Sequence, residues 1–415
     1  MTPPTKPLEP VRLMLFDVNS RGHHAGYIEH VLRAWRQSGA EGRLVAAISP
    51  LLLDAFPAVR ELEGPTERGS VELIMIPGAP AIEAQAGLFR KGLGERRLLK
   101  RYADALRPEA IVGLYGDHTQ FVLASGVRLP PQTRVSLLFL RVSHHRRSAN
   151  EPRWTAVTRC RKVAVLRAAF RHPQMDTAFS ADPTALDAIA SLVPHARTCY
   201  LPDPVPLPVP EPDLARIRAM YGIEPGRTLL LLFGALAKRK GVLHTLDALA
   251  KLSPEVARTL TVLFAGPVET DLAPILAGRL EAARARTRAQ ILLHDAFLDE
   301  PEMSALMQAA DLVLLPYQLH AGTSSVLIRA AGAGRPVLTQ TFGLMAEQTV
   351  RYRLGQTVDT AQPEAIAAGI LAYVQNPARG FDAATARAFA ESHTPEAYGH
   401  ALLDGLGLLG RAPSS

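Results

Sequence analysis

Several features that mark special classes of protein are scarce in this chain of 415 residues. It has only two cysteines, Cys160 and Cys199, which are too few for a disulfide framework or for a metal site built from cysteines alone. Its longest apolar runs are the length of strands, far short of the roughly 20 residues of a membrane-spanning helix. The Pro-rich N-terminus lacks the apolar segment of a signal peptide. We therefore expect a cytoplasmic protein in a reducing compartment.

Aromatic residues are also scarce at 6%, and charged residues make up 20%, against 47% hydrophobic residues. The apolar content excludes a disordered chain, and the length suggests two or three domains. The net charge of +7 lies in the first half, because residues 1–203 hold 27 Lys and Arg against 19 Asp and Glu. A basic half could face nucleic acid, an anionic membrane surface or a phosphorylated substrate. Nucleic acid is disfavoured because no aromatic side chains interleave with the basic run as stacking platforms.

Short apolar runs alternate with amphipathic stretches along the chain, a pattern typical of parallel sheets covered by helices on both faces. We expect two Rossmann-like sheets. The first would have strands at 11–18, 42–49, 71–77, 110–116, 134–142, 176–180 and 198–202, and the second at 228–236, 259–266, 290–297, 311–317, 335–340 and 356–359.

A proline-rich segment, 201–214, separates the two sets of strands and can continue neither sheet. It predicts an N-terminal Rossmann-like domain over 1–203 and a C-terminal one over 204–384. The last segment, 385–415, is helical in pattern, and we expect it to pack back on the first domain.

Two loops of the second half have the composition of anion sites. After the strand at 228–236 comes a basic loop and then a helix that starts near Gly241; backbone N–H groups and the helix dipole at such a turn favour phosphate. Lys238, Arg239 and Lys240 add positive charges. Alone, the pattern is equally typical of a solvated basic loop.

The second loop lies within residues 311–343, where a strand ends at Pro316 and a small-residue helix spans 326–333. The polar turn between them contains Gly322, Thr323, Ser324 and Ser325. Any of the three hydroxyl residues could cap the helix, whose free N–H groups would form a second anion site. In isolation, capping alone is the commoner role of such serines.

In this order and spacing, the two loops resemble the nucleotide-sugar domain of GT-B glycosyltransferases, in particular glycosyltransferase family 4. The family's G-x-L turn with its Lys-Gly is matched by Gly234, Leu236 and Lys240-Gly241, and its strand–helix–strand run by residues 310–337. The resemblance covers about residues 198–375 and over 1–197 is one of organisation. It implies an α/β protein of the GT-B fold, with two Rossmann-like doubly wound domains facing across a cleft.

The resemblance also implies roles for single residues. Lys240 would bind the donor diphosphate, main-chain groups at Phe297 and Leu298 would hold the base, and the helix start at Gly322–Ser325 would face the diphosphate and the sugar. The first domain would bind the acceptor and contribute the loop after its first strand. That loop includes Gly22 and His23, and its glycines would let the backbone approach the donor. The nucleotide-diphosphate sugar is then a co-substrate, so no separate cofactor is expected, and the anomeric configuration would be retained.

Two features depart from the family pattern. The paired glutamates that commonly hold the donor sugar fall at Ala321 and Arg329, and the Arg that usually follows the first glycine is Ala235. A neighbouring basic residue of the loop could replace that Arg. Glu347, just downstream of the helix, could replace a sugar contact, although an ordinary surface residue is the simpler alternative.

Sugar transfer needs the leaving diphosphate stabilised and the acceptor hydroxyl held near the anomeric carbon. Lys240 and the helix start would meet the first need, and a histidine the second. Histidines follow three expected strands of the first half: His23-His24, His118 and His144-His145. We favour Asp117-His118, because its strand should end at the ligand-binding edge and family members often have a His there. Adjacent histidines rarely converge on one ion, so we predict no bound metal.

Residues 86–107 predict a helix with an apolar stripe and a strongly cationic side. It could lie on an anionic membrane and bring a lipid-linked acceptor to the site, which would make the protein peripheral at the inner membrane face. Packing of the stripe on the sheet is the simpler alternative.

The leading hypothesis is a glycosyltransferase that acts on a glycan, lipid or small-molecule acceptor. The alternatives are a catalytically degenerate GT-B protein that acts as a binding or scaffold partner in a glycan pathway, and a sugar-nucleotide epimerase of the same architecture.

Overall fold

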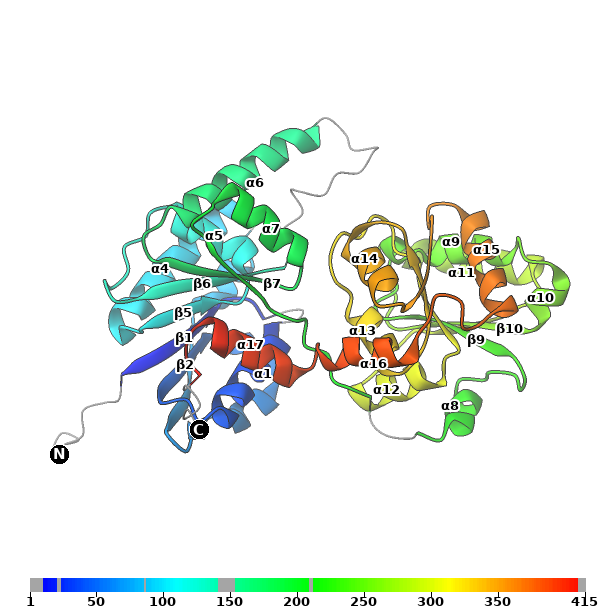
Figure 1. The fold of residues 1–415 in the computed structure, drawn as a ribbon, viewed down its shortest axis with the longest axis horizontal. Coiled ribbons are helices and arrows are strands. Elements are labelled where there is room, and N and C mark those ends of the chain that lie inside the picture. The colour runs from blue at the N-terminus through cyan, green and yellow to red at the C-terminus, as the bar shows by residue number, and fades with distance from the viewer. Residues whose placement is uncertain (1–9, 21–23, 86, 141–153, 209–211, 410–415) are drawn as a thin grey trace. The chain divides into compact units, whose positions relative to one another are not determined.

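The computed structural model describes residues 10–20, 24–85, 87–140, 154–208 and 212–409. Contacts between residues divide the chain into two compact units. Unit 1 contains Met1–Pro204 and Pro395–Ser415, and unit 2 contains Val205–Thr394. Each unit has its own sheet with helices on both faces (Figure 1).

The sheet of unit 1 has the strand order β3-β4-β2-β1-β5-β6-β7-β8. Its pairs are parallel, except that β3 runs antiparallel to β4. Since β2 and β5 lie on opposite sides of β1, the order reverses at the β1–β5 edge, the kind of switch point at which α/β sheets bind ligands. The strands are β1 (Val11–Asp17), β2 (Gly42–Ile48), β3 (Gly64–Pro65), β4 (Gly69–Met75), β5 (Ala110–Gly113), β6 (Arg134–Phe139), β7 (Met175–Ser180) and β8 (Arg197–Tyr200).

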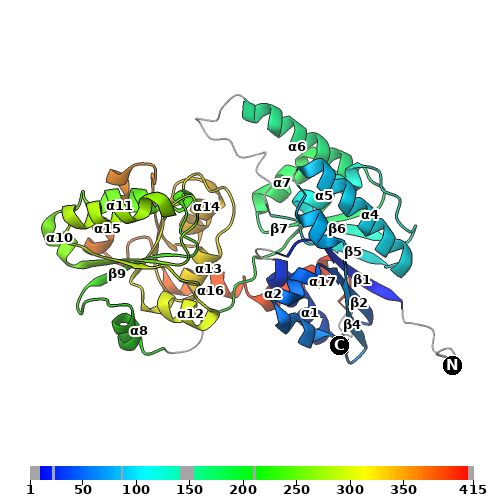
Figure 2. The same cartoon turned by 180° about the vertical axis from the view of Figure 1, so that it is seen from behind.

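Two layers of helices cover this sheet (Figure 2). One face is covered by α1 (His24–Gln37), α2 (Pro50–Ala55), the 3-10 helix η1 (Pro57–Leu62) and α17 (Pro395–Gly405). The other face is covered by α3 (Ala79–Glu83), α4 (Leu88–Leu106), α5 (Gly116–Ala124), α6 (Trp154–Phe170) and α7 (Pro183–Leu192).

The C-terminal helix α17 returns to unit 1 and lies along α1 (Figure 1). The rings of Tyr27 and Tyr398 stack with centroids 5.5 Å apart. The expected return from residue 385 comes too early: α16 (Ala383–Glu391) buries Phe389 and Ala390 in the core of unit 2, so the chain rejoins unit 1 only at Pro395.

The sheet of unit 2 is wholly parallel, with the order β11-β10-β9-β12-β13-β14. Its switch point lies between β9 and β12. The strands are β9 (Thr228–Phe233), β10 (Leu260–Ala265), β11 (Gln290–His294), β12 (Leu312–Leu315), β13 (Val337–Gln340) and β14 (Gly355–Val358). The strands β9, β10 and β12 are almost wholly apolar, as expected for strands buried on both faces.

The helices of unit 2 also form two layers. One apolar cluster joins the sheet to α8 (Leu214–Met220), α12 (Glu300–Ala309), α13 (Ser325–Gly332) and α16. A second cluster, on the other face, contains α9 (Val242–Leu249), α10 (Pro254–Arg258), α11 (Ala273–Arg286) and α15 (Pro363–Gln375). The 3-10 turn η2 (Lys238–Lys240) precedes α9, and α14 (Gly343–Arg351) joins β13 to β14.

Every strand that the sequence predicts is present, and the short β3 is an addition. The predicted strands that end at Ser180 and Gln340 stop where the observed strands do, whereas the others extend past the observed carboxyl end. The stretch 110–116, for example, ends as a strand at Gly113, and Gly116 begins α5.

The predicted helix at 86–107 is α4, and its apolar stripe packs in the core: Leu99 and Ala103 are buried there, with Leu98, Tyr102 and Leu106 beside them. In the part of the chain that the structure describes, no helix is both long and apolar enough to span a membrane.

Candidate functional site

The two loops that the sequence singles out meet at the switch point of unit 2. Gly241 has φ +74°, and a Cβ on it would lie 2.0 Å from the carbonyl oxygen of Pro316, so only glycine fits where the β9–α9 loop contacts the end of β12. The N–H of Gln318 donates to the carbonyl of Arg239 at 2.8 Å. The loops are therefore held against each other by backbone contacts.

Lys240 differs from the other basic residues of its loop because it is buried, at 7% exposure. Its Nζ donates to the carbonyl oxygen of Phe233 at 3.0 Å and lies 5.4 Å from the centroid of the Tyr317 ring. No carboxylate of the described residues forms an ion pair with it. Burying an ammonium group with only a carbonyl and a ring beside it costs free energy. An anion bound next to it would offset that cost.

Gly234 provides the room for this ammonium group. Its φ is +92°, and a Cβ on it would lie 2.6 Å from Nζ of Lys240. Lys238 and Arg239 are exposed instead, and the guanidinium of Arg239 lies 4.0 Å from the carboxylate of Glu269. Of the three basic residues that the sequence singles out, only Lys240 is therefore fixed at the switch point.

The N-terminus of α13 presents backbone donors at the same end of the sheet. Ser324 is the N-cap residue, but its hydroxyl makes no capping bond. The N–H groups of Ser325, Val326 and Leu327 have no acceptor among the residues described, and the buried hydroxyl of Thr323 has none either. Unsatisfied donors at a helix N-terminus form a site for negative charge.

A network of hydrogen bonds fixes the turn that contains Gly322. The ring Nε2 of His320 pairs with the carbonyl of Thr323 at 2.8 Å, and the amide of Gln340 bonds the backbone of His320. Gly343, at φ +78°, lies so close that a Cβ on it would be 2.5 Å from the carbonyl oxygen of His320. The turn is thus held between β13 and α14, which preorganises the donors of α13.

The positions of the missing glutamates are occupied differently. Arg329 forms a two-bond ion pair with Glu300 of α12, with one N–O distance of 2.9 Å, so its side chain is turned to a neighbouring helix. Ala321 offers no polar side chain. Glu347 lies on α14 and is exposed.

The two residues proposed to hold the base lie in the loop between β11 and α12. The ring of Phe297 is 82% exposed, whereas Leu298 is buried in the core with α12. An exposed aromatic ring after a strand of a parallel sheet is a suitable surface for stacking a base.

Of the site residues predicted in unit 1, the structure describes some and not others. Gly22, His23 and His144-His145 lie outside the described residues. Asp117 and His118 lie in the first turn of α5; the carboxylate of Asp117 accepts from the N–H of Leu140 at 2.9 Å, which ties α5 to the end of β6. The ring of His118 lies edge-on to Tyr115, with centroids 4.4 Å apart.

The structure pairs His24, one of the histidine candidates from the sequence, with Asp17, which the sequence did not single out. Asp17 is the last residue of β1, and His24 is the first residue of α1; Nδ1 of His24 and Oδ2 of Asp17 form a hydrogen bond. Burial lowers the pKa of His24, but the hydrogen bond and the charge of Asp17 outweigh it, so the pKa is raised. The sequence contained one signal for this pair: an expected strand ends near an Asp, and a His follows seven residues later.

Three more ionisable groups surround this pair. Glu83 accepts from the N–H and the hydroxyl of Ser20 at 3.0 and 2.7 Å, and Lys91 donates to the side chain of Asn19 at 2.6 Å. Glu95 is buried, and one of its carboxylate oxygens has no partner in the described part of the chain. Burial raises the pKa of Glu95 to about 7.

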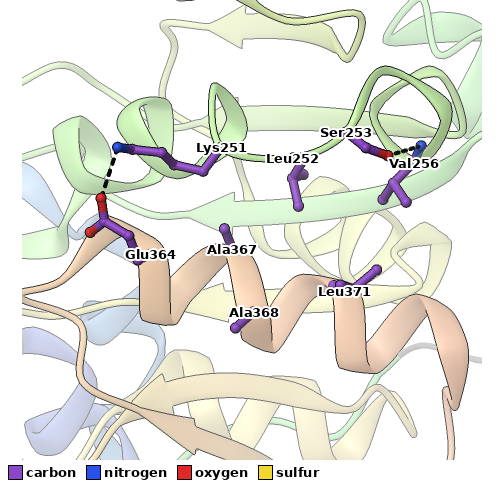
Figure 3. Close-up of a pocket in the computed structure, with 8 residues that line it drawn as sticks. All are labelled: Lys251, Leu252, Ser253, Val256, Glu364, Ala367, Ala368 and Leu371. Atoms are coloured by element: carbon purple, nitrogen blue, oxygen red, sulfur yellow. Dashed lines mark hydrogen bonds and ion pairs between the residues drawn. The ribbon is translucent and has the colours of Figure 1, made fainter.

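A hollow of about 430 Å³ lies elsewhere on unit 2, between α15 and the chain that joins α9 to α10 (Figure 3). Its walls are mainly aliphatic, and Lys251 and Glu364 form an ion pair at one end, 2.8 Å apart. None of the residues proposed for the donor site lines it, and its charged groups already satisfy each other.

Comparison with known proteins identifies the architecture around the switch point of unit 2. Residues 227–376 match the family model described as "Glycosyl transferases group 1". Over 123 residues, the chain is 38% identical to the lipopolysaccharide glucosyltransferase WaaG of Escherichia coli strain K12; the match covers 29% of this chain and 30% of WaaG.

Two solved structures resemble nearly the whole chain. HepE of Anabaena, solved with UDP, has a TM-score of 0.68 and 14% identity and covers 96% of this chain and all of its own. Sucrose-phosphate synthase of Thermosynechococcus elongatus has a TM-score of 0.68 and 15% identity, over 96% of this chain and 98% of its own. The chain therefore has the GT-B fold, and residues 227–376 match the group 1 glycosyltransferase model, in keeping with the resemblance of this half of the sequence to glycosyltransferase family 4.

Proposed function

We propose that this protein is a glycosyltransferase that moves a sugar from a nucleotide-diphosphate sugar to a hydroxyl group of an acceptor. The observation that carries the proposal is the buried ammonium group of Lys240, which has no counter-ion among the described residues and lies at the switch point of a group 1 glycosyltransferase domain. A diphosphate supplies the negative charge that this group lacks.

The N-terminus of α13 supports the same ligand. The N–H groups of Ser325, Val326 and Leu327 would donate to phosphate oxygens, and the helix dipole would stabilise the charge that develops on the leaving diphosphate. Because backbone donors and Lys240 carry this task, it needs no resident metal or cofactor. The donor we propose to test first is UDP-glucose, because HepE was solved with UDP-glucose and WaaG is named as a glucosyltransferase.

The changes at Ala321 and Arg329 affect the recognition of the sugar and leave the diphosphate contacts in place. Arg329 is engaged with Glu300, so another group must hold the sugar hydroxyls. Glu347 is the candidate for that role. These changes are the observation that favours the second candidate function, a GT-B protein that binds nucleotide without transferring sugar.

The proposed location is cytoplasmic, or peripheral at the inner face of a membrane. The apolar stripe of α4 packs in unit 1, so a membrane contact would have to use its cationic side, where Arg97, Lys100 and Arg101 are exposed. The acceptor could be a glycan, a lipid-linked sugar or a small molecule.

The experiment that tests the function measures release of UDP, GDP and ADP from their glucose and mannose derivatives, with and without sugar acceptors. We expect one nucleotide to be released by the wild type and the Lys251→Met variant, and release to fall by about 100-fold or more in Lys240→Met. Lys251 is a matched control because it is an exposed lysine of the same unit, paired with Glu364. Binding of a nucleotide without its release from any donor would favour the non-catalytic alternative. Conversion of the nucleotide sugar into an isomer without an acceptor would indicate an epimerase.

A further inference from the structure

The ion pair between Glu300 and Arg329 lies where two helices of unit 2 begin. The helix α12 leads from β11 to β12, and α13 leads from β12 to β13, so both helices start at the carboxyl ends of strands. Glu300 is the first residue of α12, and Arg329 lies one turn after Ser325, the first residue of α13. The pair is therefore at the same edge of the sheet as the ammonium group of Lys240, where ligands of such sheets bind.

Three acidic residues begin α12, and Glu300 differs from the other two in its contacts. Oδ1 of Asp299 accepts from the N–H of Glu302 at 2.9 Å, and the carboxylate of Glu302 accepts from the N–H of Asp299 at 3.1 Å. These two carboxylates cap the helix. The carboxylate of Glu300 instead accepts from Nη1 and Nη2 of Arg329. The two parallel bonds fix its position and its orientation beside α13.

The carboxylate of Glu300 can still accept hydrogen bonds from a ligand. Arg329 donates one bond to each of its oxygens, and an ionised carboxylate offers about four acceptor sites, so about two are left. The side chain of Glu300 is 42% exposed and that of Arg329 is 15% exposed, so a ligand can reach the carboxylate. A carboxylate held in this way is suited to accept from two neighbouring hydroxyl groups, one at each oxygen.

The surfaces on either side of the pair indicate which hydroxyl groups these are. The exposed ring of Phe297, suited to stacking a base, lies in the loop that leads into Glu300. Arg329 belongs to the helix whose N-terminal N–H groups would bind the diphosphate. In a nucleoside diphosphate the ribose joins the base to the diphosphate, so its 2′- and 3′-hydroxyl groups come between these two surfaces. Acidic side chains bind ribose hydroxyl groups in other nucleotide-binding α/β domains.

We propose that Glu300 binds the 2′- and 3′-hydroxyl groups of the donor's ribose and that Arg329 positions its carboxylate. The assignment rests on the proposed glycosyltransferase function. It makes the site selective for ribonucleotides, because a nucleotide without the 2′-hydroxyl group leaves an oxygen of the carboxylate unpaired next to the ligand. The donor sugar is attached at the far end of the diphosphate, so its hydroxyl groups need a different partner, and Glu347 remains the candidate for them.

The test compares nucleotides that differ in a single hydroxyl group. Calorimetric titration with UDP, GDP and ADP identifies the nucleotide that wild type binds, and the 2′-deoxy form of that nucleotide is then titrated in the same way. We expect wild type to bind the ribonucleotide about 10-fold more tightly than the deoxy form, and Glu300→Met to bind the two within about twofold of each other. A variant that only weakens the fold lowers both affinities and leaves their ratio unchanged.

Variants of the two neighbouring residues show whether the effect belongs to Glu300. Glu302→Gln is the matched control, because it changes an acidic residue of the same turn and glutamine can keep the capping bond. It should discriminate as wild type does. Arg329→Met should lower the ratio of affinities less than Glu300→Met does, and Arg329→Lys, which keeps the charge, should restore part of it.

The double variant Glu300→Met/Arg329→Met leaves no unpaired charge, so it takes the place of Glu300→Met if the single variant does not fold. It should discriminate no better than the single variant. An unchanged ratio of affinities in these variants, or a wild type that binds the deoxynucleotide equally well, would overturn the assignment while nucleotide binding left the proposed function standing. A wild type that binds no nucleotide would remove the proposed function, and the ribose site with it.

Discussion

Arg329 of α13 and Glu300 of α12 form a two-bond ion pair at the position where family 4 enzymes commonly have a glutamate. The side chain of Arg329 is 15% exposed, so the pair lies at the edge of the contact between the two helices. The substitution is therefore matched by a partner 29 residues earlier in the chain. The pair joins α13 to α12 and leaves no unpaired charge at this position.

The first prediction concerns this ion pair. Arg329→Met should lower the free energy of unfolding by about 1 kcal/mol, because Glu300 is partly exposed and can recover water. Arg329→Glu should cost more, since it places two carboxylates together. Urea unfolding of the two variants and of wild type measures the difference. Equal stability of Arg329→Glu and wild type would show that the pair does not join α12 to α13.

The second prediction tests the glycine at the contact of the two loops. Gly241→Ala should lower the free energy of unfolding by about 2 kcal/mol or more and weaken nucleotide binding, because the added Cβ meets Pro316 and the φ of +74° is strained. Gly222→Ala is the matched control: its φ is +70°, but no atom lies within 4 Å of the added Cβ. It should cost about 1 kcal/mol and leave binding intact. Equal effects of the two variants would contradict the tight contact.

The third prediction concerns the buried carboxyl group of Glu95. Its pKa is about 7 in the folded protein against 4.5 for an exposed glutamate, so the folded state holds the proton more tightly. Between pH 4.5 and 7 the folded state therefore carries more protons than the unfolded state, and stability falls as the pH rises through this window. The loss is about 3 kcal/mol at most.

Glu95→Gln keeps the shape of the side chain and removes the titration. Denaturant unfolding between pH 4.5 and 8 should therefore show wild type losing stability relative to this variant as the pH rises. Parallel stability curves for the two proteins would show that Glu95 has an ordinary pKa.

Much of this architecture could be predicted from the sequence, because strands buried on both faces produce continuous apolar runs such as that of β9. Lys240 could be picked out because its spacing from Gly234 follows the family motif. The sequence could not predict that Lys240 is buried and Lys238 exposed. This difference depends on how η2 packs against the end of β12.

The pairs that define the two sites were also beyond the sequence. Asp17 and His24 meet only because α1 begins at the residue that brings the imidazole back over the end of β1. The sequence showed that Arg329 replaces a glutamate but not that Glu300 pairs with it, because that contact depends on the packing of two helices. Contacts of this kind are set by tertiary structure and leave no periodic pattern in the chain.

The central claim is that the ammonium group of Lys240 binds the diphosphate of a nucleotide. The most direct measurement is calorimetric titration of wild type, Lys240→Met and Lys251→Met with UDP, GDP and ADP. We predict that wild type and Lys251→Met bind one of these nucleotides with equal affinity and that Lys240→Met binds it at least about 10-fold more weakly, the loss of one charge-assisted contact. Equal binding by all three proteins, or no binding by a folded wild type, would contradict the account.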